Sequence, residues 1–180
     1  GMTGLGILVS FLPLIFILVM NFGINRISYP VLLVLFLLFS AVMGMSLSTI
    51  FFIYTGPSII NAFASASAVF GLMAFVGYTT KTDLTKFGAI MTIGLIAIVV
   101  VSLVNMFLRN DTIDYVVSFI GVLVFTGLTA YDVQKLKNIG SGVQFGLEST
   151  GKLVIMGALN LYLDFINLFL FLLRLFGDRK

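Results

Sequence analysis

Long apolar stretches, separated by short polar segments, make up nearly the whole of this 180-residue chain. Hydrophobic residues account for 60% of the chain and charged residues for only 9%, whereas about a quarter of the residues in a soluble domain are charged. A helix crosses the hydrocarbon core of a bilayer, about 30 Å thick, with roughly 20 apolar residues. The chain is therefore expected to be an all-α, polytopic integral membrane protein. A soluble domain, a disordered chain and a nucleic-acid binder are excluded.

Polar segments and the Gly-Pro pair at 56–57 set the expected limits of six membrane-spanning helices. The spans are expected at about Leu5–Met20, Val31–Tyr54, Ser58–Tyr78, Leu84–Leu108, Ile113–Val133 and Lys152–Phe176. The longest polar stretch, Gln134–Gly151, is expected to be a loop. Residues 1–180 are expected to form a single transmembrane helical domain.

Lysine and arginine are divided unequally between the two ends of such a bundle. Cytoplasmic loops carry an excess of these residues, which places the loops after the first, third and fifth spans in the cytoplasm and both chain ends outside. An external amino terminus without a leader is explained if one further helix precedes the chain. The six residues on the cytoplasmic side are Arg26, Lys81, Lys86, Lys135, Lys137 and Lys152.

The composition also restricts the chemistry, because the chain contains no cysteine and no histidine. A disulfide, a thiolate nucleophile and a Cys/His metal site are thereby excluded. Acid–base chemistry would have to come from carboxylates, tyrosine or lysine. No bound cofactor is expected.

Two of the seven acidic residues lie within apolar spans: Asp132 in the last turn of the fifth and Asp164 in the middle of the sixth. A charge at the centre of a span costs about 2.5–3.5 kcal/mol on insertion scales, so an intramembrane acid is a functional-site hypothesis by default. Asn160, Asp164 and Asn167 share one helical face. This polar seam is consistent either with a hydrogen-bond network that fixes helix register or with an ion or proton pathway.

The two aspartates could meet between consecutive helices. Contact requires the sixth span to begin beyond the membrane or the fifth to sit deeper, because Asp164 is otherwise about 18 Å deep and Asp132 only about 5 Å. Two adjacent carboxyl groups cannot both remain ionised, so the pair would share a proton and titrate as a unit. Such a pair could sense pH without a histidine.

Several segments resemble the Bax inhibitor-1 family, also called the transmembrane Bax inhibitor motif family. Leu161–Phe169, followed by Leu172-Leu173-Arg174 and Gly177, resembles the family's last-helix signature, and Tyr131-Asp132 resembles the site of its other aspartate. Family members have seven helices, so the chain looks like a bacterial-type member without the first one. Segments similar to the middle helices are Gly44–Ser48, Phe51–Tyr54, Phe70-Gly71 and Gly77–Leu84.

The resemblance implies a bundle with the last helix at its centre, in a bacterial inner membrane, and a pH-sensitive calcium leak rather than an enzyme. Asp132 and Asp164 would be the di-aspartyl pH sensor, and Arg26 occupies the place of an arginine that latches this pair. Asn160, Asn167 and Tyr131 would line the pathway. The two aspartates and two asparagines offer too few oxygens for a tight calcium site, and weak, transient coordination suits conduction.

Other functions remain open. A regulatory scaffold that binds membrane proteases or cell-death and stress partners would need no ion path. A proton-coupled carrier could use the same acids, although broken-helix repeats are not visible. An intramembrane aspartyl protease also places two aspartates on successive helices, but its second aspartate typically follows Gly-x-Gly, and here those positions are Leu161 and Leu163. The lipid bilayer, calcium ions and protons are the expected partners, with membrane proteins as further candidates.

Overall fold

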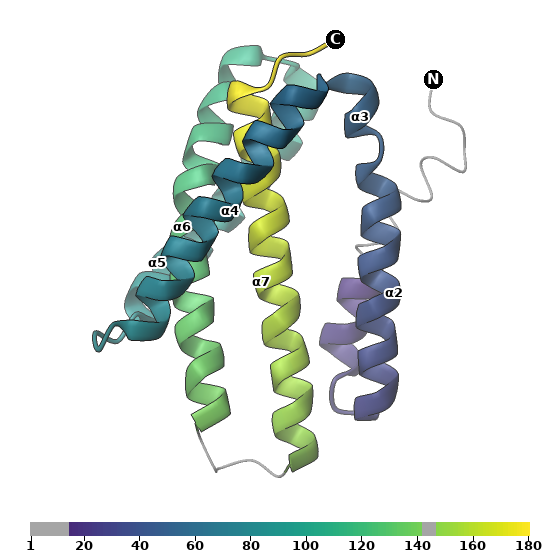
Figure 1. The fold of residues 1–180 in the computed structure, drawn as a ribbon, viewed down its shortest axis with the longest axis vertical. Helices are drawn as coiled ribbons and strands as arrows, with labels where there is room; N and C mark the ends of the chain where they lie inside the picture. The colour runs from purple at the N-terminus through teal and green to yellow at the C-terminus, as the bar shows by residue number, and fades with distance from the viewer. Residues whose placement is uncertain (1–14, 142–146) are drawn as a thin grey trace.

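The computed structural model describes residues 15–141 and 147–180, which form a bundle of helices (Figure 1). Five stretches among these residues are long and apolar enough to cross a membrane. The all-α membrane bundle predicted from the sequence is thus confirmed. After a helical segment at 15–23, the elements are α2 (Tyr29–Leu47), α3 (Ile50–Ile53), α4 (Gly56–Thr79), α5 (Thr85–Leu108), α6 (Asp111–Ser141) and α7 (Leu147–Phe176).

The first expected span lies mostly outside the described residues, and the next three agree closely with the structure. Proline stands in the first turn of both α2 and α4, where its missing N–H removes no helical hydrogen bond. At the end of α5, Arg109 adopts a left-handed conformation with φ 50°. The side chain of Asn110 then accepts hydrogen bonds from the backbone N–H groups of Thr112 and Ile113 and caps α6.

The predicted loop at Gln134–Gly151 is wrong for most of its length. Helix α6 continues to Ser141 and α7 begins at Leu147, while residues 142–146 lie outside the described part of the chain. The 31 residues of α6 correspond to about 46 Å, well beyond the ~30 Å of hydrocarbon. The polar residues therefore mark where α6 leaves the membrane, and the helix itself continues.

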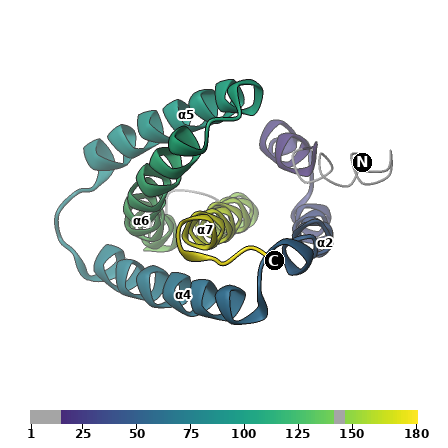
Figure 2. The ribbon, with the colours of Figure 1, turned by 90° about the horizontal axis from the view of Figure 1, so that it is seen from above.

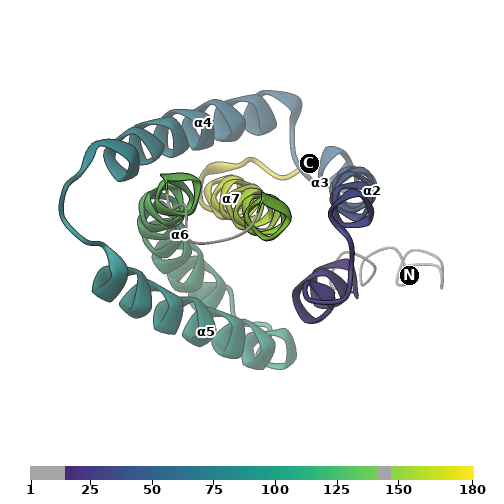
Figure 3. The same cartoon turned by 90° about the horizontal axis from the view of Figure 1, so that it is seen from below.

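Helix α7 is the centre of the bundle, as predicted. Viewed from either end, it lies inside a ring formed by the other helices (Figures 2 and 3). It packs against α2, α4 and α6, whereas α5 packs on α6. Aromatic side chains make these contacts: Tyr162 meets Phe39 of α2, with ring centroids 5.6 Å apart. Likewise Phe165 meets Phe63 of α4 at 5.5 Å, and Phe171 stacks on Phe125 of α6 at 5.9 Å.

The positive charges expected in the cytoplasm gather at one end of the bundle, called here the basic end. It comprises the turn at 24–28, the α4–α5 loop and the ends of α6 and α7 that the 142–146 connection joins (Figure 1). The opposite end, called here the C-terminal end, carries α3, the α5–α6 turn and residues 177–180.

Glycines allow α6 to approach its neighbours closely. A Cβ atom on Gly77 of α4 would overlap the backbone carbonyl of Ala130, and one on Gly88 of α5 would overlap the ring of Tyr131. Small residues let helix backbones approach within van der Waals contact in a membrane. These two glycines hold α4 and α5 against the part of α6 that carries Asp132.

Replacing Gly77 by alanine is expected to loosen the α4–α6 contact. The added methyl group meets backbone, which cannot move aside, and overpacking of this kind lowers the free energy of unfolding by about 1–3 kcal/mol. Gly71→Ala is the matched control on the same helix, because its Cβ would meet nothing within 4 Å. Thermal unfolding in detergent should show a lower midpoint for G77A only; equal midpoints would contradict the packing.

Candidate functional site

Asp132 of α6 and Asp164 of α7 face each other inside the bundle. Their carboxyl groups lie within hydrogen-bonding reach of one another, and they are only 9% and 4% exposed. Two ionised carboxylates have no proton to donate. A hydrogen bond between these two groups therefore requires one proton on the pair.

One oxygen of this pair has no partner. Among the described residues, Oδ2 of Asp164 is the buried side-chain oxygen or nitrogen that makes no hydrogen bond. A buried acceptor left unsatisfied costs about 1–3 kcal/mol and calls for an explanation. The pair is thus incompletely satisfied by the surrounding protein.

The antiparallel register of α6 and α7 brings the two aspartates to one level. Phe125 stacks on Phe171 on one side of the pair, and on the other side Leu136 packs where Gly157 has no side chain. Helix α7, which corresponds to the sixth expected span, begins at Leu147, five residues before the expected start at Lys152. The earlier start adds about 8 Å of helix before Asp164.

A small cavity of about 60 Å³ adjoins the pair between α6 and α7. Asp132 lines it together with Asn160 and Lys135, and its remaining lining residues lie further toward the basic end. Lys135 stands three residues beyond Asp132 on the same helix, and its charge acts on Asp132. Polar groups thus lie beside the aspartates, and the part of the cavity nearer the basic end is apolar. The other lining residues are Leu136, Ile139, Leu153, Met156 and Gly157.

The other predicted site residues do not join the pair. Asn167 donates its amide hydrogen to the carbonyl of Leu163 in its own helix, at 2.8 Å. The ring of Tyr131 packs on Gly88 of α5. Arg26 lies exposed in the turn at 24–28, and among the described residues no ion pair joins it to either aspartate. Its predicted role as a latch has no corresponding contact in this structure.

Two residues that the sequence assigned to a loop fasten α6 to its neighbours. The amide of Gln134 donates to the carbonyl of Thr82 and accepts from the backbone N–H of Leu84, both at 2.8 Å. Lys137 donates to the carbonyl of Tyr78 at 2.7 Å. Extending the helical pattern past Val133 would have placed both side chains beside the α4–α5 loop.

Asp83, in that loop, is also acidic but has a different environment. Its Oδ1 accepts hydrogen bonds from the backbone N–H of Thr85 at 2.9 Å and from the Thr85 hydroxyl at 2.6 Å. These hydrogen bonds, the side-chain one first, hold the pKa of Asp83 below its ordinary value. Asp83 therefore stays charged near neutral pH and is no candidate for a pH sensor.

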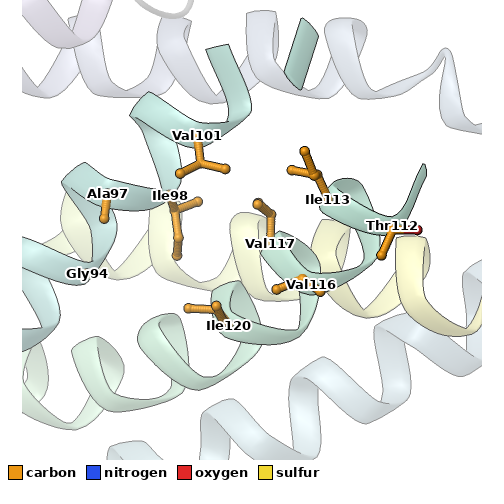
Figure 4. Close-up of a pocket in the computed structure, with 9 residues that line it drawn as sticks. All are labelled: Gly94, Ala97, Ile98, Val101, Thr112, Ile113, Val116, Val117 and Ile120. Carbon is orange, nitrogen blue, oxygen red and sulfur yellow. The ribbon is translucent and has the colours of Figure 1, made fainter. Parts of the chain in front are cut away.

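A cavity of about 420 Å³ between α5 and α6 lies away from the aspartates (Figure 4). Its lining is apolar apart from Thr112, whose hydroxyl is turned away from the cavity. A dry apolar space offers no ligands to an ion. This cavity therefore does not extend the polar site.

The donors around the pair do not form a resident metal site. Within residues 15–141 and 147–180, no group of three or more acidic, histidine or cysteine side chains could hold a metal ion. Calcium takes six to eight oxygen ligands. Two carboxyl groups and the Asn160 amide supply fewer than that.

Comparisons with known proteins identify the family of this chain. Residues 2–180 match the family described as inhibitor of apoptosis-promoting Bax1. The chain belongs to the Bax inhibitor-1 family.

Curated relatives place this family member in a membrane. The chain is 46% identical over 177 residues to the inner membrane protein YbhL of Escherichia coli K12, covering 98% of the chain and 75% of that protein. It is 43% identical to protein RP147 of Rickettsia prowazekii, covering 99% of the chain and 75% of that protein. With its apolar helices, the chain is an integral protein of a bacterial inner membrane.

Two substitutions of Asp164 should distinguish the effect of its charge from the effect of its hydrogen bonding. In Asp164→Asn the amide donates to Asp132 at any pH, so the variant should unfold at or above the wild-type temperature. Asp164→Leu leaves Asp132 without this partner, and the free energy of unfolding should fall by about 1–3 kcal/mol. Thermal unfolding in detergent measures both; equal stability of the leucine variant and the wild type would argue against the hydrogen bond.

Proposed function

We propose that this protein is a pH-sensitive calcium leak channel of the inner membrane, gated by the pair Asp132–Asp164. The proposal rests on one observation: two buried carboxyl groups, one on the central helix and one on α6, lie within hydrogen-bonding reach of each other. The choice of calcium as the ion comes from the resemblance to the Bax inhibitor-1 family. The cavity next to the pair, which Asp132, Lys135 and Asn160 line on one side, supports a path from the side assigned to the cytoplasm.

The hydrogen-bonded pair represents the closed state. One shared proton neutralises half of the charge and holds α6 and α7 together at this level. Above the pair, Phe125 and Phe171 stack between the same two helices and leave an apolar layer. An ion cannot lose its hydration shell in such a layer without a large cost.

Loss of the shared proton opens the path. Two carboxylates at hydrogen-bonding distance repel each other, and this repulsion is strong in a medium of low dielectric constant. The helices separate, water enters and the oxygens become free to contact a cation. Calcium then binds weakly through the two aspartates and Asn160 and passes on, because a weak site releases its ion.

The leak should rise with pH on the side of the basic end, and Asp164→Asn should abolish that dependence. Asparagine keeps a hydrogen-bond donor at every pH, so the pair cannot acquire a second charge. The measurement is calcium entry into dye-loaded liposomes that contain the purified protein, at a series of pH values. We expect calcium entry to differ by at least about tenfold between the closed and the open state, which corresponds to ~1.4 kcal/mol in the gating equilibrium.

Asp111→Asn is the matched control, since Asp111 is an exposed residue at the other end of α6. Its flux should follow the wild type. A wild-type protein without calcium flux, but with intact binding to membrane proteins, would favour the regulatory scaffold. Cleavage of a transmembrane substrate would favour the protease. Either result would refute the channel.

Lys135→Met should shift the pH at which the leak opens to higher values. Lys135 lines the cavity beside Asp132 and stabilises a second negative charge there, so without it the shared proton is retained longer. The same liposome assay measures the midpoint. Lys81→Met removes an equal charge from the exposed α4–α5 loop and should leave the midpoint unchanged; equal shifts in both variants would indicate a general surface effect.

A further inference from the structure

A second cavity, of about 310 Å³, lies at the C-terminal end of the bundle between α3 and α7. It is separate from the aspartates. Four aliphatic side chains and three side chains with polar ends line it. The aliphatic residues are Ile50, Ile53, Leu170 and Leu173, and the others are Tyr54, Arg174 and Arg179.

The cavity combines aliphatic and cationic side chains at the end of the bundle. Leu170 lies six residues before the end of α7 at Phe176, about 9 Å deeper in the membrane. Arg174 is in the last turn of α7, and Arg179 lies beyond the helix. Leu170 thus marks the deep end of the cavity, while Ile53 and Tyr54 lie level with Arg179, because Tyr54 pairs with Arg179 and Lys180 donates its N–H to the carbonyl of Ile53.

Neither arginine is strongly engaged by an acid. Arg174 lies 3.7 Å from Asp114, but both side chains are about 40% exposed, and exposed pairs of this kind contribute only about 0–1 kcal/mol. Arg179 lies over the ring of Tyr54, 5.9 Å from its centre, and pairs with no acid among the described residues. Both guanidinium groups can therefore give up these contacts and bind an anion that interacts with them more strongly.

The tail that carries Arg179 is held in place by backbone contacts. Thr55 donates its backbone N–H to the carbonyl of Asp178 at 3.1 Å, and Lys180 donates to the carbonyl of Ile53 at 2.8 Å. The hydroxyl of Ser58 accepts from the N–H of Asp178. Arg179 is thus positioned at the mouth of the cavity before any ligand binds, which lowers the entropic cost of binding.

We propose that this cavity binds an anionic phospholipid from the leaflet on the C-terminal side. The guanidinium groups of Arg174 and Arg179 hold the phosphate, for which arginine's paired N–H groups are well suited. The upper part of one acyl chain packs on Ile50, Leu170 and Leu173. A free phosphate would use the arginines alone and would leave the aliphatic wall without a partner.

Native mass spectrometry of the delipidated full chain tests this proposal. Titration with phosphatidylglycerol should show one lipid that binds more tightly than the rest. Replacing both arginines by alanine should weaken this binding at least about tenfold. Lys81→Ala with Lys86→Ala removes the same number of charges at the basic end and should leave the lipid affinity unchanged.

Two further measurements distinguish the ligand and control for folding. Glycerol phosphate, which has the anionic headgroup but no chain, should bind at least about tenfold more weakly than phosphatidylglycerol. Arg179→Ala alone leaves the Arg174–Asp114 pair intact and should still weaken lipid binding, with unfolding temperature as the check. Equal binding of glycerol phosphate, or an equal loss in the lysine variant, would overturn the proposal.

Discussion

An acid group inside hydrocarbon has to be neutral or bonded, and this constraint decides how the bundle is assembled. Asp164 lies in the middle of α7, the helix at the centre of the bundle, so it could not be turned toward lipid. The structure meets the constraint by placing a second buried acid, Asp132, beside Asp164. A lysine in that position would have given a permanent ion pair, whereas two adjacent carboxyl groups can share a proton.

Much of the fold follows from the sequence, because each span is decided locally by its own apolar residues. Hydropathy alone places α4 and α5 to within a few residues, and the polar seam on α7 indicates a central helix. The limits of α6 and α7 do not follow in the same way. At the membrane surface, polar residues are compatible with helix or loop, and the hydrogen bonds of Gln134 to the distant residues Thr82 and Leu84 stabilise the helix.

The candidate site likewise has one part that the sequence predicts and one part that it does not. Its two acids stand out in the sequence because their cost in a membrane is large wherever the helices pack. The neighbours of those acids depend on helix rotation, which local sequence does not set. Tyr131 therefore faces Gly88 of α5 although it adjoins Asp132, and Lys135 faces the cavity although hydropathy places it in a loop.

The contacts of α6 also bear on which helix can move. Next to Asp132, helix α6 is in direct contact with both α4 and α5, since Ala130 abuts Gly77 of α4 and Tyr131 covers Gly88 of α5. One turn further, Gln134 and Lys137 tether it. The same half of α7 rests on α2 through Tyr162, whose ring meets Phe36 and Phe39 edge-on, and through leucine and methionine side chains. Helix α6 is therefore anchored to α4 and to the α4–α5 loop, so Asp132 is held in place by contacts that do not involve α7.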